Sequence, residues 1–353
     1  MTLLADRLAQ LIRQNGPLTV ADYMRQCLLD PNFGYYTTRE PFGAQGDFIT
    51  APEISQMFGE LIGLALAQTW LDQGAPNPCA LVELGPGRGT LMSDILRATK
   101  GVPGFLDAID VHLVEASPAL RAIQEQTITT RIHHHDTVAT LPDTPILLVA
   151  NEFFDALPVR QYVRSGNGWR ERVIGLVDGA LAFGLADLSH PPVLKPRLSD
   201  TTDGDLIEVC PSAAAIVRDI DSRIAQHGGV AYVIDYGDWR SLGDTLQAVR
   251  AHNREPILER PGLADLTTHV DFEALSTAAT GTKKSRLCPQ GVFLERLGIA
   301  DRARALARNL AGAALDQHIA AHRRLTHPDE MGTLFKVMTL SPIDAPLPPG
   351  MTT

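Results

Sequence analysis

The sequence predicts an α/β fold built on a mostly parallel β-sheet, with a helical segment before it and a β-rich insertion inside it. Three observations support this prediction. An apolar segment at 81–92 runs into a glycine-rich turn, a second at 109–118 ends in an acid, and a third at 144–159 is followed by polar side chains. Polar residues just past the carboxyl ends of parallel strands are typical of ligand sites in open α/β sheets.

The glycine-rich turn has the pattern E-x-G-x-G-x-G, formed by Glu83, Gly85, Gly87 and Gly89. Glycines let the backbone turn sharply and approach a ligand closely, and the following helix presents free N–H groups. A dinucleotide fingerprint would put its third small residue at Thr90 instead. An acid before the first glycine would repel a pyrophosphate but suits a charged methionine end. The turn therefore favours S-adenosylmethionine as cofactor, the alternative being a plain chain reversal.

Two more acids are candidates for binding the rest of such a cofactor. Glu115 ends the second apolar strand, where an acid accepts hydrogen bonds from ribose hydroxyls. The alternative is a solvent-exposed strand end. Asp136 follows the three consecutive histidines 133–135 and is a candidate for the adenine amino group. Because adjacent strand residues point to opposite faces, the three histidines cannot converge on one metal, and we expect no metal site.

The third apolar segment has five apolar residues in succession at 146–150, which suits a buried parallel strand. Asn151, Glu152 and Asp155 come directly after it. We expect the chemistry at this strand end, with Asn151 on the cofactor side.

The remaining elements follow from breaks in the hydrophobic pattern. Residues 1–75 look helical, interrupted by a loop at 30–53 that suits a substrate-facing lid or a packed connector. The predicted strands lie near 80–84, 109–114, 130–133, 145–150, 228–237, 284–289 and 334–340; a β-meander is expected at 160–186 and helices at 54–73, 212–226 and 265–280. This order predicts three parts: a helical segment at 1–75, a core at 76–155 and 227–353, and an inserted substrate-facing subdomain at 156–226.

Composition narrows the possible partners. The chain has 353 residues, 44% of them hydrophobic, and a net charge of −10. Few aromatic residues and an acidic balance disfavour nucleic acid and mildly favour a cationic peptide. The four cysteines, Cys27, Cys79, Cys210 and Cys288, form no C-x-x-C pair, which favours a reducing compartment.

The first seventeen residues have an amphipathic helical period without an apolar signal core. We therefore expect a bacterial cytoplasmic protein with no stable membrane insertion, the alternative being the mature form of a mitochondrial matrix protein.

Eight segments, spread over almost the whole chain, resemble the MidA family of class I S-adenosylmethionine-dependent methyltransferases. They are GDFITAPEISQMFGE (46–60), VELGPGRGTLMSDILR (82–97), NEFFDALPV (151–159), EVCPSA (208–213), VIDYG (233–237), DLTTHVDF (265–272), QGVFLERLGI (290–299) and EMGTLFKV (330–337). The resemblance implies a Rossmann-like, seven-stranded sheet. It also implies a protein arginine methyltransferase that dimethylates a 49-kDa-type subunit of respiratory complex I symmetrically and supports assembly of the complex.

An arginine acceptor needs carboxylates, because its guanidinium is protonated and its lone pairs are delocalised. Acids that grip two N–H groups draw positive charge toward the bound nitrogens and leave the third more nucleophilic. Glu152 and Asp155 are candidates for this clamp. The better-known arginine methyltransferases use two glutamates after the same strand. Asp155, the second acid here, differs from that pattern in residue type and in its spacing from Glu152. The alternatives are that Glu152 caps a helix or binds a backbone amide and that Asp155 caps a turn.

Two further residues are candidates for the acceptor side of the site. Asp235, at the end of the fifth core strand, could line a peptide groove or stabilise a turn before Gly237. His269 lies in T-T-H-V, which is similar to the histidine loop of some arginine methyltransferases, although a lone histidine is more often structural.

The leading function is protein arginine methylation, with a protein that exposes an arginine as partner. Methyl transfer to a small molecule or lipid is one alternative, since fold does not fix the acceptor. A non-catalytic assembly chaperone that binds the cofactor is the other. The sequence leaves the oligomeric state open, a homodimer included.

Overall fold

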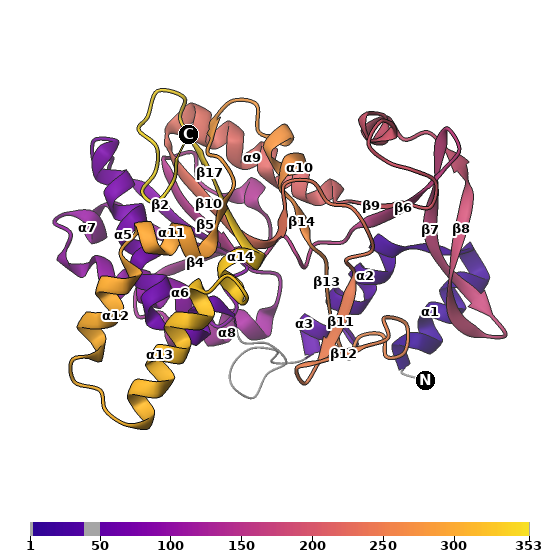
Figure 1. The fold of residues 1–353 in the computed structure, drawn as a ribbon, viewed down its shortest axis with the longest axis horizontal. Helices are drawn as coiled ribbons and strands as arrows, with labels where there is room; N and C mark the ends of the chain where they lie inside the picture. Colours follow the sequence, from indigo (N-terminus) through magenta and orange to yellow (C-terminus); the bar gives the residue numbers. More distant parts are fainter. Residues whose placement is uncertain (1–2, 39–49, 353) are drawn as a thin grey trace.

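A twisted mixed sheet occupies one half of the molecule and a smaller antiparallel sheet the other half (Figure 1). This computed structural model describes residues 3–38 and 50–352. Residues 39–49 of the predicted lid loop at 30–53 lie outside the described residues.

The central sheet has nine strands. Seven form a continuous path in the order β15-β17-β10-β5-β2-β3-β4, while β14 pairs with β10 and β16 with β17. β10, β5, β2, β3 and β4 are mutually parallel, and β17 is antiparallel to β10. The strands are β2 (Cys79–Leu84), β3 (Ile109–Val114), β4 (Ile132–His135), β5 (Ile146–Asn151), β10 (Gly229–Asp238), β14 (Val270–Asp271), β15 (Lys283–Lys284), β16 (Cys288–Pro289) and β17 (Phe335–Ser341).

Two sequence predictions differ from this sheet. The strand predicted at 284–289 is replaced by β15 and β16, because between them Ser285 accepts a hydrogen bond from the Thr339 N–H through its side chain and Arg286 donates to Thr352. The helix predicted at 265–280 starts only at Phe272. Its capping acid is Asp271, and the residues before it pair as strands, since tertiary pairing overrides a short helical pattern.

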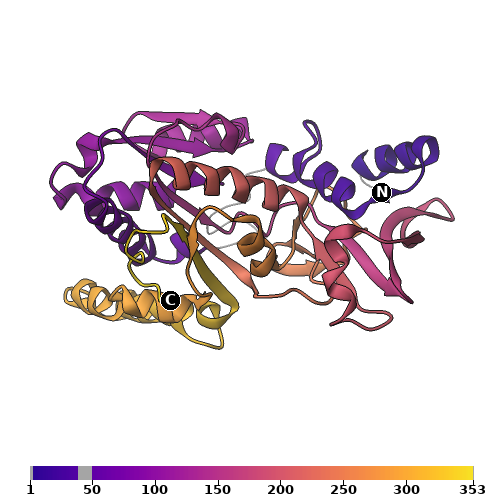
Figure 2. The ribbon, with the colours of Figure 1, turned by 90° about the horizontal axis from the view of Figure 1, so that it is seen from above.

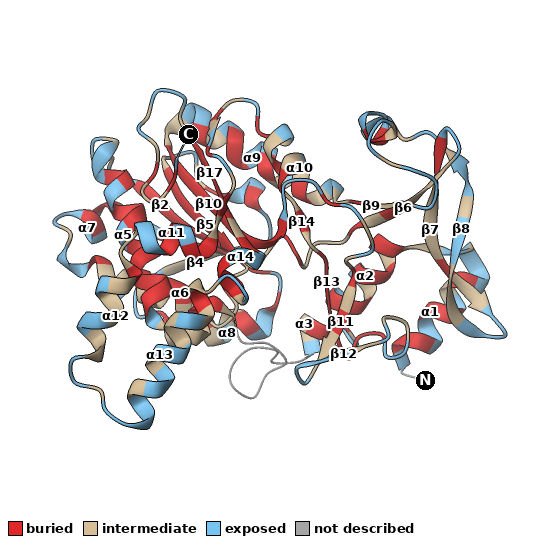
Figure 3. Cartoon of the chain, viewed as in Figure 1, coloured by how far each residue is buried: buried red, intermediate tan, exposed pale blue. Residues whose placement is uncertain are grey.

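Helices cover both faces of the central sheet. The strands bury alternate residues on the two faces, so that Leu147 and Val149 face one core and Leu148 and Ala150 the other. This double burial explains the near-continuous apolar run of β5 and its neighbours (Figure 3). One face is packed by α5 (Gln56–Asp72), α6 (Thr90–Ala98) and α11 (Gln290–Arg296), and the other by α9 (Pro211–His227) and α10 (Phe272–Ala278), with α9 lying along the sheet (Figure 2).

The remaining helices of this half are short or peripheral. They are α4 (Ala51–Ile54), α7 (Phe105–Ala108), α8 (Pro118–Thr127), α12 (Ile299–Ala307), α13 (Ala313–Thr326) and α14 (Met331–Leu334), with short 3₁₀ turns at Thr99–Gly101 and Val138–Thr140. Helices α12 and α13 form a hairpin that projects away from the second half (Figure 1). Within residues 3–38 and 50–352, no helix combines the length and apolar character needed to cross a membrane.

The second half contains the predicted β-meander. Strands β6 (Arg160–Ser165), β7 (Gly168–Val177) and β8 (Ala180–Ser189) follow each other as antiparallel neighbours, and β9 (Leu206–Val209) and β1 (Leu18–Thr19) complete a five-stranded sheet. Two further 3₁₀ turns lie at Pro192–Leu194 and Pro196–Leu198.

The N-terminal helices share their core with this insertion. Helices α1 (Leu3–Asn15), α2 (Val20–Leu29) and α3 (Tyr35–Thr38) lie beside the five-stranded sheet and a small sheet of β11 (Gln247–Arg250), β12 (Asn253–Glu255) and β13 (Asp265–Thr267). One apolar cluster joins Leu8, Met24, Ile174 and Leu266 from these parts. The three-part division of the chain stays a prediction, and the packing adds that the first helices and the insertion are in contact.

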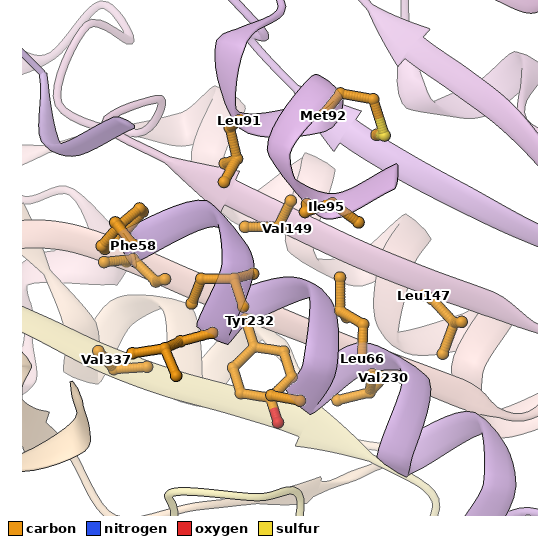
Figure 4. Packing of buried hydrophobic residues seen from close by; sticks show 14 of the residues in the cluster. Phe58, Leu66, Leu91, Met92, Ile95, Leu147, Val149, Val230, Tyr232 and Val337 are labelled. Carbon is orange, nitrogen blue, oxygen red and sulfur yellow. The ribbon is translucent and has the colours of Figure 1, made fainter. Parts of the chain in front are cut away.

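Helix α5 anchors the core on its face of the central sheet. Ser55 caps its start by accepting a hydrogen bond from the Met57 N–H at 3.2 Å. Leu66 is fully buried against the central strands, as Figure 4 shows, whereas Leu64 on the same helix is 46% exposed.

Replacing Leu66 with alanine should therefore lower the free energy of unfolding by about 2.7–5 kcal/mol, because the core cannot fill the cavity. Leu64→Ala, the matched control, should cost less than about 0.5 kcal/mol. Urea unfolding of the two variants measures the difference. Equal losses in both would show that α5 does not pack as described.

Candidate functional site

A cavity opens at the carboxyl ends of β2, β3 and β5. Its volume is about 390 Å³, within the range of small-molecule sites. A narrower cavity of about 40 Å³ adjoins it, and both are lined by Gly85, Gly87 and Glu152. The three strand ends marked by the sequence therefore meet at one connected site.

The glycine-rich turn forms the floor of both cavities. Gly85, Gly87 and Gly89 have φ values of 61°, 52° and 83°, a region that side-chain-bearing residues rarely adopt. A Cβ on Gly85 would lie 2.9 Å from Cδ2 of Phe153. Gly89 is the N-cap of α6, so the free N–H groups of that helix begin at the turn.

Buried oxygen atoms without partners face the narrower cavity. Among the described residues, Oε2 of Glu83 and Oδ1 of Asn151 have no hydrogen-bond partner, and both residues line this cavity. Burial raises the pKa of Glu83 to about 8, with the Met92 N–H opposing the rise and Glu115 adding to it. A buried acceptor without a partner makes the folded state less stable, so this end of the site suits a ligand with N–H donors and positive charge.

Glu115 lines the larger cavity, and hydrogen bonds from Ser117 and Gln124 hold its carboxylate in place. Its Oε1 accepts from the Ser117 N–H at 2.7 Å, and its Oε2 accepts from Gln124 at 3.4 Å. Burial raises its pKa, and these hydrogen bonds oppose the rise. The geometry leaves lone pairs of both oxygens for ligand hydroxyls.

Asp136 lies at the rim of the same cavity, and its side chain is 85% exposed. It pairs with Arg121 at 2.5 Å. Its predicted contact with an adenine amino group stays a prediction, since an exposed acid is less firmly placed than Glu115.

Glu152 lies where the two cavities meet. Its φ of 51° is unusual for a residue with a side chain and is stabilised by the hydrogen bond from its N–H to the Ile234 carbonyl at 3.0 Å. Its Oε1 accepts from the Ala51 N–H at 3.0 Å and from the Asn151 side chain at 3.2 Å. Glu152 therefore binds a backbone amide, as one sequence alternative proposed, while its side chain also lines the site.

The pKa of Glu152 is raised to about 7. Burial is the largest cause; the Ala51 N–H opposes it, Asp155 adds to it, and Arg324 opposes it more weakly. The Glu152 carboxyl thus titrates near neutral pH.

Asp235 is absent from the described lining of both cavities, and its place in a peptide groove stays a prediction. It is fully buried, and its Oδ2 accepts three successive backbone N–H groups, those of Phe153, Phe154 and Asp155, at 3.2, 3.0 and 3.3 Å. Asp235 therefore holds the turn that carries Glu152, which is a different turn from the one before Gly237 that the sequence alternative named.

Asp155 lies behind Glu152, within the protein. It is 5% exposed, and its side chain accepts a hydrogen bond from the Tyr236 hydroxyl. Its Oδ1 has no partner among the described residues, and burial raises its pKa to about 6. It is absent from the described lining of both cavities, so the structure does not bring it beside Glu152 at the cavity wall.

His269 packs against the side chain of Tyr236. Its ring meets the Tyr236 ring edge-on with 5.4 Å between centroids, and its backbone N–H donates to the Thr245 hydroxyl at 2.8 Å. Burial lowers its pKa, and Lys336 and Arg254 lower it further. It too is absent from the described cavity lining, so its predicted catalytic role stays a prediction.

The sequence reasoning missed Tyr36 and Gln124. Tyr36 lines the larger cavity from α3. Its hydroxyl donates to both oxygens of Asp265 at 2.9 and 3.0 Å, and its backbone carbonyl accepts from the Ser117 hydroxyl at 2.8 Å. Gln124 is fully buried on α8, one turn after the buried Leu120. A polar residue at a core-facing helix position was the available signal for Gln124. Tyr36 lies in the loop predicted at 30–53, but nothing singled it out there, because its partners Ser117 and Asp265 lie far away in the chain.

The histidine run stands beside a fourth histidine that the sequence analysis did not single out. His112 packs its ring on His133 and lies 2.9 Å, Nδ1 to Nε2, from His135. His134 points to the other face, toward Gln124. Across residues 3–38 and 50–352, no group of three or more His, Cys, Asp or Glu side chains is arranged to hold a metal ion.

Comparison with known proteins supports the reading of this site. Residues 61–289 match the model of a family described as "Putative S-adenosyl-L-methionine-dependent methyltransferase". The chain is 37% identical to a Xenopus laevis protein named protein arginine methyltransferase NDUFAF7, mitochondrial, over 94% of this chain and 82% of that protein. It is 36% identical to the Homo sapiens protein of the same name, over 94% of this chain and 81% of that protein.

Solved structures agree with the sequence relatives. A Burkholderia thailandensis protein crystallised with S-adenosyl-homocysteine is 29% identical, with a TM-score of 0.83, over 98% of this chain and 93% of that chain. The native crystal structure of a Burkholderia thailandensis protein gives a TM-score of 0.80 at 28% identity, over 96% of this chain and 91% of that chain. The α/β fold with mixed sheets is therefore shared with these proteins.

The residues of this chain fit the cofactor of that family. The glycine turn permits close backbone approach, the unpartnered oxygen of Glu83 suits an ammonium group, and Glu115 presents lone pairs to a larger cavity. The resemblance to the MidA family is confirmed by these matches. The chain belongs to the family of S-adenosyl-L-methionine-dependent methyltransferases, and S-adenosyl-L-methionine is its cofactor.

Proposed function

We propose that this enzyme is a protein arginine methyltransferase that acts on a 49-kDa-type subunit of respiratory complex I and supports assembly of the complex. The names of the Xenopus and human relatives support the arginine acceptor, at identities of 37% and 36% over nearly the whole chain. The complex I subunit is implied by the family resemblance. The partner is thus a protein segment with an exposed arginine.

The position of Glu152 carries this proposal. It is an acid at the junction of the two cavities, held on a strained backbone, with the buried carboxyl groups of Asp155 and Asp235 behind it. Burial raises the pKa of all three carboxyl groups. Asp155 raises the pKa of Glu152 further, and Asp155 and Glu152 together raise that of Asp235. A cation at Glu152 relieves this repulsion, and a guanidinium offers planar N–H donors as well as charge.

The division of work follows from the contacts. S-adenosylmethionine supplies an activated methyl group when bound, so the protein has to orient the acceptor. Glu152 accepts N–H groups of the guanidinium and draws its positive charge toward the bound nitrogens. Asp235 keeps the turn at residues 152–155 in place, and the hydrogen bond between Asp155 and the Tyr236 hydroxyl supports the same turn. Asn151 and Glu83 belong to the cofactor side, and Asp136 to its adenine end.

We further propose that the central sheet follows the seven-strand plan of class I methyltransferases, with β15 and β16 in place of the sixth strand. The relatives are named mitochondrial, and the proposed substrate places this enzyme in the bacterial cytoplasm or the mitochondrial matrix. Whether it acts as a homodimer is measurable by light scattering.

A methylation assay tests the acceptor. The purified enzyme, labelled S-adenosylmethionine and an isolated 49-kDa-type subunit should yield dimethylarginine on that subunit, located by mass spectrometry. Comparing complex I from cells with and without this gene extends the test. Methylation of small molecules or lipids alone, with none on the subunit, would contradict the protein-substrate proposal.

Gly87→Val should abolish cofactor binding, because a branched side chain at φ 52° strains the turn and enters the cofactor floor. Calorimetry with S-adenosylhomocysteine measures this. Gly166→Val is the control: its φ of 56° matches, but no atom lies within 4 Å of its added Cβ, in a hairpin turn between β6 and β7. Binding at normal affinity by the Gly87 variant would contradict the cradle.

Glu152→Gln keeps the shape of the side chain and removes its charge. Turnover should fall about 10- to 150-fold, the equivalent of roughly 1.5–3 kcal/mol for a charge-assisted hydrogen bond that strengthens in the transition state. Affinity for S-adenosylhomocysteine should hardly change. Glu125→Gln, at a side chain that is 65% exposed, is the control. Near-normal turnover would exclude the clamp, and loss of cofactor binding would show a structural role.

The raised pKa of Glu152 predicts a pH profile. Because the carboxylate form grips the acceptor and its pKa is about 7 in the ligand-free protein, the rate should rise with pH through about 7. Both substrates are kept well below saturation, where the rate reports the ligand-free enzyme. Glu152→Gln should lack this step. A wild-type profile that is flat between pH 6 and 8 would show that the Glu152 charge is not required.

A further inference from the structure

Gln124 connects three parts of the cofactor site that are far apart in sequence. It projects from α8 and is fully buried. Its Nε2 donates to the Gly87 carbonyl at 2.7 Å and to Oε2 of Glu115 at 3.4 Å, and its Oε1 faces Nε2 of His134 at 2.9 Å. One neutral side chain thus links the glycine turn after β2 to the acid after β3.

The surroundings of Gln124 permit one orientation of its amide. If the amide were turned over, its oxygen would face the Gly87 carbonyl and the Glu115 carboxylate, which are both acceptors. In the observed orientation the NH₂ group meets both acceptors and the oxygen is left for a donor. His134 must then carry a proton on Nε2, so the amide also fixes the state of the histidine.

We propose that Gln124 is a positioning residue for the cofactor: it sets the spacing between Gly87 and Glu115 and aims the Glu115 carboxylate into the larger cavity, while His134 holds Gln124 in place. The ligand recognised through this arrangement is the vicinal diol of a ribose.

The hydrogen bonds at Glu115 give the chemical reason. Its Oε1 already accepts from the Ser117 N–H at 2.7 Å, and its Oε2 accepts from Gln124. Each oxygen keeps further lone-pair capacity, so the carboxylate can accept from two neighbouring hydroxyls at once. Two internal donors on opposite sides stop it from rotating. Without Gln124, one side of this buried acid would be free to turn away from the cavity.

Other side chains of similar size cannot replace Gln124. A glutamate would place an oxygen against Gly87 and a second charge beside Glu115. A methionine fits the space but donates no hydrogen bond, leaving the Gly87 carbonyl and Glu115 without this donor. Gln126, two residues along the same helix, is exposed and provides a matched control.

The test uses the full-length enzyme, calorimetry and two ligands, S-adenosylhomocysteine and its 2′-deoxyribose analogue. Gln124→Met should bind S-adenosylhomocysteine about 10- to 100-fold more weakly, as expected for lost buried hydrogen bonds to a charged group. For the 2′-deoxy analogue the same substitution should lower the affinity much less, because this ligand lacks the diol at which Glu115 is aimed in the wild type. Gln126→Met should bind both ligands as the wild type does.

Kinetics and double variants separate positioning from a merely structural role. Gln124→Met should raise the KM for S-adenosylmethionine and leave kcat at saturation close to wild type. The losses of binding free energy caused by Gln124→Met and by Glu115→Gln should not add in the double variant, because both changes remove the same contact. His134→Phe, which removes the donor to the amide, should weaken binding in the same direction but less.

Three results would overturn the proposal. The first is an affinity of Gln124→Met for S-adenosylhomocysteine within about twofold of wild type, since the loss of a buried hydrogen bond weakens binding by more than that. The second is an equal loss of affinity for the two ligands. The third is full additivity with Glu115→Gln. Should Gln124→Met fail to fold, the same two-ligand comparison on His134→Phe decides, and equal losses there count against the proposal.

Discussion

The turn after β5 depends on one buried carboxylate. Asp235 gathers three successive N–H groups of residues 153–155, and Glu152 donates its own N–H to Ile234 of the same neighbouring strand. These bonds hold Glu152 at a positive φ that its side chain would otherwise disfavour. The position of the acid at the cavity junction therefore follows from a second acid that is outside the described cavity lining.

Buried acids give the site its electrostatic character. Burial raises the pKa of Glu83 to about 8, of Glu152 to about 7 and of Asp155 to about 6. The folded protein thus holds protons that the unfolded chain releases above about pH 4.5, so these groups make the ligand-free fold less stable as pH rises toward 8. Cationic ligands reverse this effect, so the buried acids suit a sulfonium cofactor and the guanidinium acceptor that we propose.

The second half of the molecule contributes to the same site. Helix α3 brings Tyr36 to the wall of the larger cavity, where its carbonyl accepts from Ser117 and its hydroxyl binds Asp265. Helix α9, which packs on the central sheet, closes another part of that wall with Ile216. The N-terminal helices and the central-sheet half therefore meet at this cavity, which suits the acceptor that we propose, a protein segment larger than the cavity itself.

The sequence by itself determined the α/β class, the principal core strands, the β-meander and the strand-end positions of Glu83, Glu115, Asn151 and Glu152. It could do so because hydrophobic runs and glycine spacing are local signals, and parallel strands bring their carboxyl ends to one edge. The acceptor roles of Asp155 and His269 remain predictions, since Asp155 binds the Tyr236 hydroxyl, His269 packs on the Tyr236 ring, and neither is part of the described cavity walls.

Only the tertiary structure decided what Asp235, Gln124 and Tyr36 do. The partners of Asp235 are some 80 residues away, and the hydroxyl of Tyr36 meets Asp265 across 229 residues of chain. The strand predicted at 284–289 was likewise replaced by two short pieces through contacts with β17. Hydrogen bonds between distant segments leave no local pattern, so the chain has to fold before an acid is either a ligand contact or a support for one.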